Sequence, residues 1–159
     1  MKIESLSCHP EAVSVIAGWY YQEWGHVSAE ITLQDIEEDL KTYTEVRDAL
    51  PRALVAVQRD AIIGVAELKI REVRHLPQYE HWLGGLFVDP AHRGMSIGGE
   101  LIQRVHQLAY CDYGIETLYL QTERLDGGLY TRHGWAKLQT IMLDRCERLI
   151  MSKALSQHH

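Results

Sequence analysis

The stretch VDPAHRGMSIGGELI (residues 88–102) joins an apolar run to a helical pattern and contains Gly94, Gly98 and Gly99. A chain that leaves a strand and enters a helix presents unpaired backbone N–H groups, and the helix dipole favours an anion there. Glycines let a ligand approach the main chain and permit positive φ where amides converge. Arg93 can add a charge-assisted hydrogen bond to a phosphate. The stretch therefore predicts a phosphate or pyrophosphate site at the start of the helix.

A second interpretation of this stretch is a plain glycine-rich turn that packs the helix closely on a sheet. Two familiar phosphate motifs do not fit it. A nucleotide-binding P-loop ends in Gly-Lys-Ser/Thr, which is absent here. The dinucleotide fingerprint places its glycines after the first strand, whereas these glycines lie past the middle of the chain.

The elements around this stretch predict a mixed sheet with helices on both faces. A helix between the strands 82–88 and 117–122 implies a parallel, right-handed crossover, whereas the hairpins are antiparallel. Thr32 is an expected N-cap with Asp35 three residues later, and Pro51 is expected to end that helix. Residues 53–70 are expected to form two strands joined by a turn at 59–61. The other expected strands are 2–6, 82–88, 117–122, 135–143 and 148–154, and the expected helices are 9–25, 32–50, 97–114 and 127–134.

Composition is that of an ordinary globular protein. The 159 residues are 46% hydrophobic and 24% charged, which predicts one domain over residues 1–159. The net charge of -6 means that basic residues are not in excess, so we expect no nucleic-acid partner. No apolar run approaches the roughly 20 residues that span a bilayer, and the start has no apolar leader, so we expect a cytoplasmic protein without membrane contact. Cys8, Cys111 and Cys146 are expected to be reduced thiols.

The glycine-rich stretch and the strand before it resemble a motif of a known family. The stretch LFVDPAHRGMSIGGELI (86–102) resembles the acetyl-coenzyme A motif of the GNAT acetyltransferase superfamily, in which a strand ends in Val-x-Pro and Arg-Gly-x-Gly-x-Gly/Ala leads into a helix. The matching residues are Val88, Pro90, Arg93, Gly94 and Gly98. Ser96 stands where the second glycine is usual. A serine there keeps its backbone N–H, can cap the helix and can offer a hydroxyl to phosphate.

A later segment, LYLQTERLDGGLYTRHGW (118–135), is similar to the family's short helix carrying Tyr-x-x-x-Gly-Phe/Trp, which Tyr130, Gly134 and Trp135 match. The expected order of elements also matches, so the resemblance covers nearly the whole chain. It implies an α/β fold of GNAT type: a mixed, mostly antiparallel sheet of about seven strands, with a splay between the two central parallel strands.

The resemblance implies an N-acetyltransferase that moves the acetyl group of acetyl-CoA to a primary amine by direct attack in a ternary complex. Tyr130 matches the family's general acid, although an aromatic ring there can also simply pack on the cofactor. A main-chain N–H such as that of Val88 is the expected oxyanion donor. The implied cofactor-binding residues are Phe87, Val88, Arg93, Gly94, Met95, Ser96, Ile97, Gly98 and Gly99.

Several residues of the sequence are candidates for the general base. Glu67, Glu80 and His81 are candidates because the family often places a carboxylate on the middle strands, and a water chain without a dedicated base is also possible. Glu67 can equally be a solvated strand residue, and His81 a structural histidine. Neighbours in a strand point to opposite faces, so at most one of Glu80 and His81 points into the cleft. His75 and His81 lack partners at ligand spacing, so no metal is expected.

The acceptor is expected to be a small-molecule amine, with a protein or peptide amine as the alternative. The acidic balance slightly favours a cationic molecule. Four aromatic residues of the first helix are interpreted as core, with acceptor-pocket lining as the alternative: Trp19, Tyr20, Tyr21 and Trp24. Two other functions remain open, a non-catalytic acyl-CoA-binding or sensor module and the transfer of a longer acyl group. Either a monomer or a homodimer is compatible with the sequence.

Overall fold

The computed structural model describes residues 1–25, 30–45 and 48–156, and it contains a seven-stranded sheet in the order β1-β2-β3-β4-β5-β7-β6. The strands are β1 (Lys2–Ser5), β2 (Arg52–Gln58), β3 (Ala61–Ile70), β4 (His81–Val88), β5 (Thr117–Thr122), β6 (Ala136–Leu143) and β7 (Cys146–Ala154). Within the described residues, β4 and β5 pair in parallel and all other neighbours pair antiparallel. The expected mixed, mostly antiparallel sheet is confirmed.

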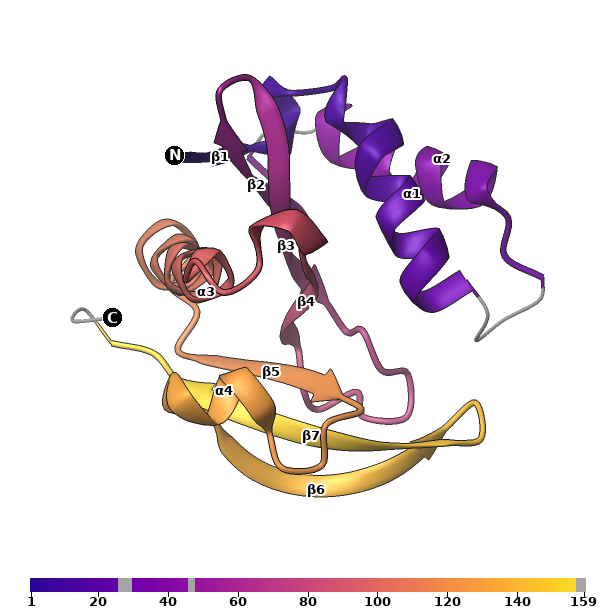
Figure 1. The fold of residues 1–159 in the computed structure, drawn as a ribbon. Coiled ribbons are helices and arrows are strands. Elements are labelled where there is room, and N and C mark those ends of the chain that lie inside the picture. Colours follow the sequence, from indigo (N-terminus) through magenta and orange to yellow (C-terminus); the bar gives the residue numbers. More distant parts are fainter. Residues whose placement is uncertain (26–29, 46–47, 157–159) are drawn as a thin grey trace.

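Helices cover both faces of the sheet (Figure 1). They are α1 (Ala12–Trp24), α2 (Leu33–Glu45), α3 (Ile97–Gln107) and α4 (Gly128–Arg132), with the short helices η1 (Leu6–Cys8), η3 (Pro90–His92) and η4 (Leu108–Asp112). Neighbouring side chains of a strand point to opposite faces, and β2 shows the result. Leu54 and Ala56 belong to the core beneath α3, whereas Ala53 and Val55 belong to the core beneath α1 and α2.

The sheet opens between its two central strands. Among the described residues, β4 and β5 pair only at Trp82 and Tyr119, and beyond that point they diverge (Figure 1). Strand β4 also carries a bulge, because Glu67 of β3 lies opposite Gly84 while Val65 lies opposite Phe87. A bulge adds a residue to one strand and redirects its main chain. The bulge and the divergence from β5 together expose one edge of β4, where the two halves of the molecule separate.

Helix α2 is shorter than the predicted helix 32–50. It ends at Glu45, residues 46 and 47 lie outside the described residues, and the chain bends at residues 48–50. A residue that precedes a proline is disfavoured in the helical region, so Leu50 before Pro51 cannot easily continue the helix. The N-terminal capping box is present, because Thr32 and Asp35 exchange side-chain-to-backbone hydrogen bonds of 3.0 and 3.1 Å.

The other expected elements are present, with changes at their ends. The predicted helix 97–114 ends before Gly114 as expected, but residues 108–112 form a π-helical turn. The aromatic residues of α1 divide between core and surface: Tyr20 is buried, whereas Tyr21 and Trp24 are 45% and 39% exposed, so the interpretation of all four as core is wrong for these two. No helix in the described part of the chain is both long and apolar enough to cross a membrane.

Candidate active site

The loop between β4 and α3 has the open backbone predicted for anion binding. Gly94 and Ser96 have φ values of 82° and 63°, and α3 begins directly after them. The backbone N–H of Glu100 donates to the Ser96 carbonyl oxygen at 3.1 Å. The amides of Ile97, Gly98 and Gly99 precede this bond in the first turn, where a helix offers no acceptor. These amides are therefore available to a ligand at the start of α3.

Two details of this loop differ from the sequence prediction. Ser96 occupies the cap position, but its side chain makes no capping hydrogen bond, because its backbone is left-handed instead of extended. Gly98 and Gly99 lie inside α3 and do not have positive φ. They instead leave space: a Cβ on Gly98 would lie 3.2 Å from Leu129 Cδ2, and one on Gly99 would lie 2.9 Å from His133 Cε1. Their small size brings α3 close to α4.

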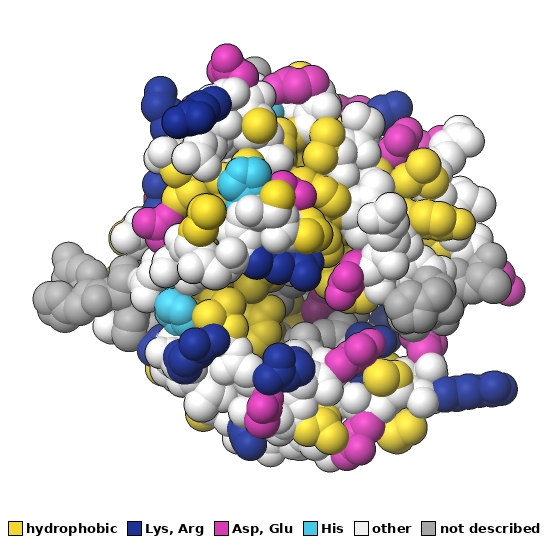
Figure 2. All heavy atoms as spheres, in the orientation of Figure 1, with side chains coloured by type: hydrophobic (Ala, Val, Ile, Leu, Met, Phe, Trp, Pro, Cys, Tyr) yellow, Lys and Arg dark blue, Asp and Glu magenta, His cyan; other side chains and the backbone are white. Residues whose placement is uncertain are grey.

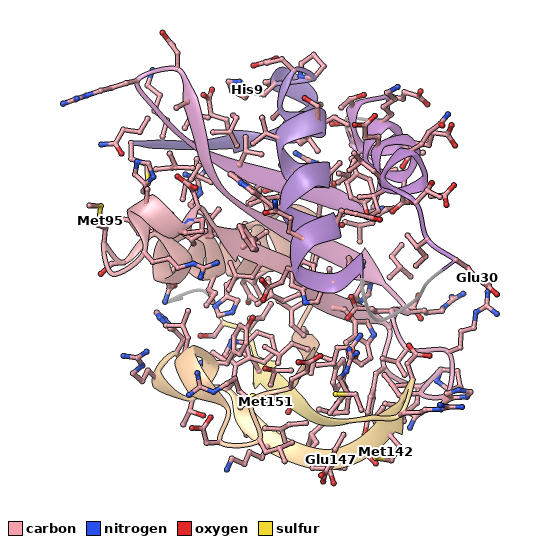
Figure 3. The ribbon with its side chains drawn as sticks, turned by 45° about the vertical axis from the view of Figure 1, so that its right-hand side comes forward. His9, Glu30, Met95, Met142, Glu147 and Met151 are labelled. Atoms are coloured by element: carbon pink, nitrogen blue, oxygen red, sulfur yellow. The ribbon has the colours of Figure 1, made fainter. Side chains whose placement is uncertain are left out.

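Arg93 lies against the end of β4. Its Nε donates to the carbonyl oxygen of Val88 at 3.0 Å, and its guanidinium carbon lies 5.1 Å from the ring centre of Phe87. These contacts hold the guanidinium at the strand edge, and its predicted bond to phosphate stays a prediction. Met95 is 62% exposed and points outwards from the loop before α3 (Figure 3).

Two cavities lie next to β4 or to the start of α3. The first, about 520 Å³, lies where β4 and β5 diverge, and the space-filling view shows a hollow with apolar side chains between the two halves of the molecule (Figure 2). The second, about 840 Å³, is bounded by β1, the start of α3 and α4, and Ser96 and Gly99 line it. We call the first cavity the cleft. Its polar lining side chains are Tyr20, Asp35, Asp39, Glu67, Lys69, Glu72, Gln121, Tyr130 and Arg148.

Glu67 lies in the wall of the cleft and is only 4% exposed, so its interpretation as a solvated strand residue is wrong. The Tyr20 hydroxyl donates to Glu67 Oε2 at 2.7 Å and lies 2.8 Å from the carbonyl oxygen of Gly85. Burial, and then the charge of Glu67, raise the pKa of Tyr20, and the same causes raise that of Tyr43. Gly85 has a φ of 57°, and a Cβ there would collide with Glu67 Oε2 and the Tyr20 hydroxyl. The glycine makes room for the buried carboxylate.

A second carboxylate in the cleft wall, Glu72, was not identified from the sequence. Lys69 Nζ lies 2.9 Å from Glu72 Oε1, and a Cβ on Gly84 would lie 2.8 Å from that same oxygen. Burial alone would lower the pKa of Lys69, but the charges of Glu72 and Glu67 raise it overall. Arg71, directly after β3, has a φ of 47°. The charged residues on and after one strand are the signal that could have identified Glu72.

Tyr130 comes to the cleft from α4. Its ring contacts Trp135 edge to face, with ring centres 6.2 Å apart. Burial, and then the negative charge of Glu72, raise the pKa of Tyr130 to about 12. The hydroxyl therefore holds its proton at neutral pH, which is the state that a general acid requires.

The other base candidates lie elsewhere. Glu80 precedes β4 and accepts two hydrogen bonds from Arg71, at 2.9 and 3.1 Å. His81 begins β4, at the end of the strand opposite the bulge. Neither is among the described residues that line the cleft. Of the three residues considered as a base, the fold brings only Glu67 into one cavity with Tyr130.

Comparison with known proteins places this architecture among solved structures. Residues 11–135 match the model of the acetyltransferase (GNAT) family. A ribosomal-protein-alanine N-acetyltransferase from Brucella melitensis is 17% identical with a TM-score of 0.75, covering 98% of this chain and 100% of that one. An aminoglycoside 6'-N-acetyltransferase complexed with coenzyme A is 16% identical with a TM-score of 0.72, covering 97% of each chain. A spermidine N-acetyltransferase variant from Vibrio cholerae is 14% identical with a TM-score of 0.71, covering 97% of this chain and 95% of that one.

At these identities the solved structures show the fold alone. The search of curated proteins found no significant match to the sequence. The family model, however, spans most of the chain and includes both segments that carry the resemblance. The chain belongs to the GNAT family of acetyltransferases.

Proposed function

We propose that the protein transfers the acetyl group of acetyl-CoA to a primary amine by direct attack in a ternary complex. One observation carries the proposal: the cleft at the β4–β5 opening contains both a protonated tyrosine, Tyr130, and a buried carboxylate, Glu67. Acyl transfer from a thioester to an amine needs an acid and a base on either side of one reacting carbon.

The residues at the β4 edge fit acetyl-CoA. Its pantetheine arm would pair with main-chain groups near Phe87 and Val88, as a peptide adds to an open strand edge. The amides from Met95 to Gly99, with the dipole of α3, would hold the diphosphate. The larger cavity beside this loop is lined by three cationic side chains that can contact phosphate groups, Lys2, Arg104 and Arg132, and by two carboxylates, Glu4 and Glu100. When bound, acetyl-CoA supplies the electrophilic thioester carbon.

The proton movements follow from the groups in the cleft. An alkylammonium has a pKa near 10, so it must lose a proton before its nitrogen can attack. That proton passes to Glu67, the base candidate that lines the cleft. The nitrogen–carbon bond forms while a main-chain N–H such as that of Val88 stabilises the oxyanion. The carbon–sulfur bond then breaks, Tyr130 gives its proton to the departing sulfur, and the second proton of the nitrogen restores the tyrosine.

A small-molecule amine is the acceptor that we expect, because the acidic lining of the cleft favours a cationic molecule, with a protein or peptide amine as the alternative. A cytoplasmic location belongs to the same proposal, because all three cysteines are unpaired thiols, as expected in a reducing compartment.

The test is an amine screen with detection of free coenzyme A thiol. The proposal predicts amine-dependent thiol release from acetyl-CoA, and the same screen with propionyl-CoA measures whether a longer acyl group is preferred. Thermal stabilisation by acetyl-CoA without turnover on any amine would instead identify a non-catalytic acyl-CoA-binding module.

A further inference from the structure

Glu72 carries a buried oxygen whose partner is missing from the described residues. Its Oε1 is paired with Lys69 Nζ at 2.9 Å, whereas Oε2 is buried and has no hydrogen-bond partner in the described part of the chain. A carboxylate oxygen removed from water without a donor is costly, so native proteins provide one from the protein, from water or from a ligand. Because Glu72 lines the cleft, a molecule bound in the cleft can provide that donor.

We propose that Glu72 Oε2 binds the acceptor amine as an ammonium ion, and that the enzyme therefore selects alkylamines without a negative group near the amine. This inference depends on the proposed acetyl transfer and deepens it by naming the acceptor class. An ammonium group offers three donors, one of which completes the coordination of Oε2.

The position of Glu72 places this ammonium next to the reacting groups. Oε1 lies beside Gly84, at the bulge where the edge of β4 becomes open. The charge of Glu72 also acts on Tyr130, the proposed acid. Glu67 lies beside Gly85, the next residue of β4. A nitrogen held by Glu72 is therefore in the same cleft as Glu67, which can take its proton.

The remaining charges of the cleft favour a cation and oppose an anion. Helix α2 contributes two exposed carboxylates, Asp35 and Asp39. On another wall, Arg148 donates to Gln121 Oε1 at 3.0 Å and lies 3.8 Å from Glu123. Lys69 is occupied by Glu72 Oε1. Among the described residues, the lining thus holds four carboxylates against two cations. Lys69 is paired with Glu72, and Arg148 lies near Glu123, although the buried Nε of Arg148 has no hydrogen-bond partner in the described part of the chain.

Three acceptors with the same carbon chain test the acceptor class: butylamine, 1,4-diaminobutane and 4-aminobutanoate. With the wild-type protein and acetyl-CoA, kcat/KM is expected to be highest for the diamine, lower for butylamine and at least tenfold lower again for the zwitterionic 4-aminobutanoate. A preference for 4-aminobutanoate, or turnover of other amines but of none of these three, would overturn the acceptor class while leaving acetyl transfer intact.

The variant Glu72→Gln tests the residue. Loss of a charge-assisted hydrogen bond should raise KM for butylamine about 10- to 100-fold, with KM for acetyl-CoA unchanged. Glu38→Gln, a matched change of an exposed α2 carboxylate outside the cleft, should leave both constants unchanged. An unchanged KM for butylamine in Glu72→Gln refutes the inference. If the wild-type protein turns over none of the amines tested, the proposed function is refuted instead.

A second variant and a binding measurement keep the test independent of folding and chemistry. Glu72→Asp retains the charge beside Lys69 but withdraws the oxygen, so an intermediate rise in KM is expected. Titration calorimetry of each coenzyme A-saturated protein with butylamine measures the affinity for the amine. This affinity should be highest for the wild type, lower for Glu72→Asp and lowest for Glu72→Gln. Equal affinity in all three proteins would exclude Glu72 as the ammonium ligand.

Discussion

A carboxylate at the start of α3 should prevent coenzyme A binding without damaging the fold. In Gly98→Glu the new Cβ would lie 3.2 Å from Leu129 Cδ2 and 3.8 Å from Val88 Cγ2. Leu129 Cδ2 is the end of a flexible side chain and needs to move by only a few tenths of an ångström. Replacing a helical glycine gains roughly 1 kcal/mol of stability, and an acidic residue in the first turn gains about 0.3–1 kcal/mol more. The free variant should therefore be at least as stable as the wild type.

The cofactor complex should lose much more. A carboxylate and a phosphate charge about 5 Å apart at an effective dielectric constant near 20 repel each other by about 3 kcal/mol. Screening by water reduces this value, and the second phosphate adds to it, so we expect affinity to fall by about 100-fold or more. Titration calorimetry with coenzyme A measures the loss, and Gly98→Gln, which has nearly the same volume without the charge, separates repulsion from steric hindrance. Wild-type affinity in a folded Gly98→Glu protein would refute the proposed diphosphate site.

Four further predictions concern activity and stability. Tyr130→Phe should lower kcat by about 100-fold with little change in coenzyme A affinity, as steady-state kinetics and calorimetry measure; full activity would remove Tyr130 from the mechanism. Tyr130 titrates near pH 12 when folded and near 10 when unfolded, so the unfolded state loses this proton first and stability falls as pH rises between those values. Urea unfolding at pH 9 and 11 should show a smaller loss in Tyr130→Phe, and identical losses would contradict the raised pKa. Ser96→Gly relieves a left-handed serine backbone, which gains about 1–2 kcal/mol of stability, and adds chain entropy to the unfolded state, which costs about 0.4–1 kcal/mol. Tm should therefore rise by up to about 6 °C, and a fall in Tm would show that the hydroxyl stabilises the loop. Gly85→Ala should lower the free energy of unfolding, measured in urea, by at least about 2 kcal/mol, because of the clash at its Cβ and its φ of 57°. Gly18→Ala, with open space around it, should raise that free energy by about 0.5–1 kcal/mol. Similar effects of the two substitutions would be incompatible with the bulge.

The local pattern of the sequence was enough to predict the scaffold of the site. The glycine-rich turn predicted an open helix start, and α3 indeed begins directly after Ser96. The segment 127–134 was predicted to form a short helix, and α4 provides it. These features depend on residues close together in the chain, where turn geometry and helix periodicity determine the structure.

Features that depend on distant contacts were not predicted. Glu67 is buried because Tyr20, 47 residues earlier, donates to it, and because Gly85 leaves room for both. Glu72 belongs to a polar loop by composition, and only the pairing with Lys69 and the bulge of β4 bring it into the cleft. Strand alternation cannot predict such a bulge, because the extra residue interrupts the period of two on which the pattern relies.

The most direct test of this account is a crystal structure of the protein with coenzyme A. We predict diphosphate oxygens about 3 Å from the backbone nitrogens of Ile97, Gly98 and Gly99, with the pantetheine arm along the open edge of β4. A complex in which these amides contact no part of the ligand, or in which the arm lies outside the β4–β5 opening, would contradict the account.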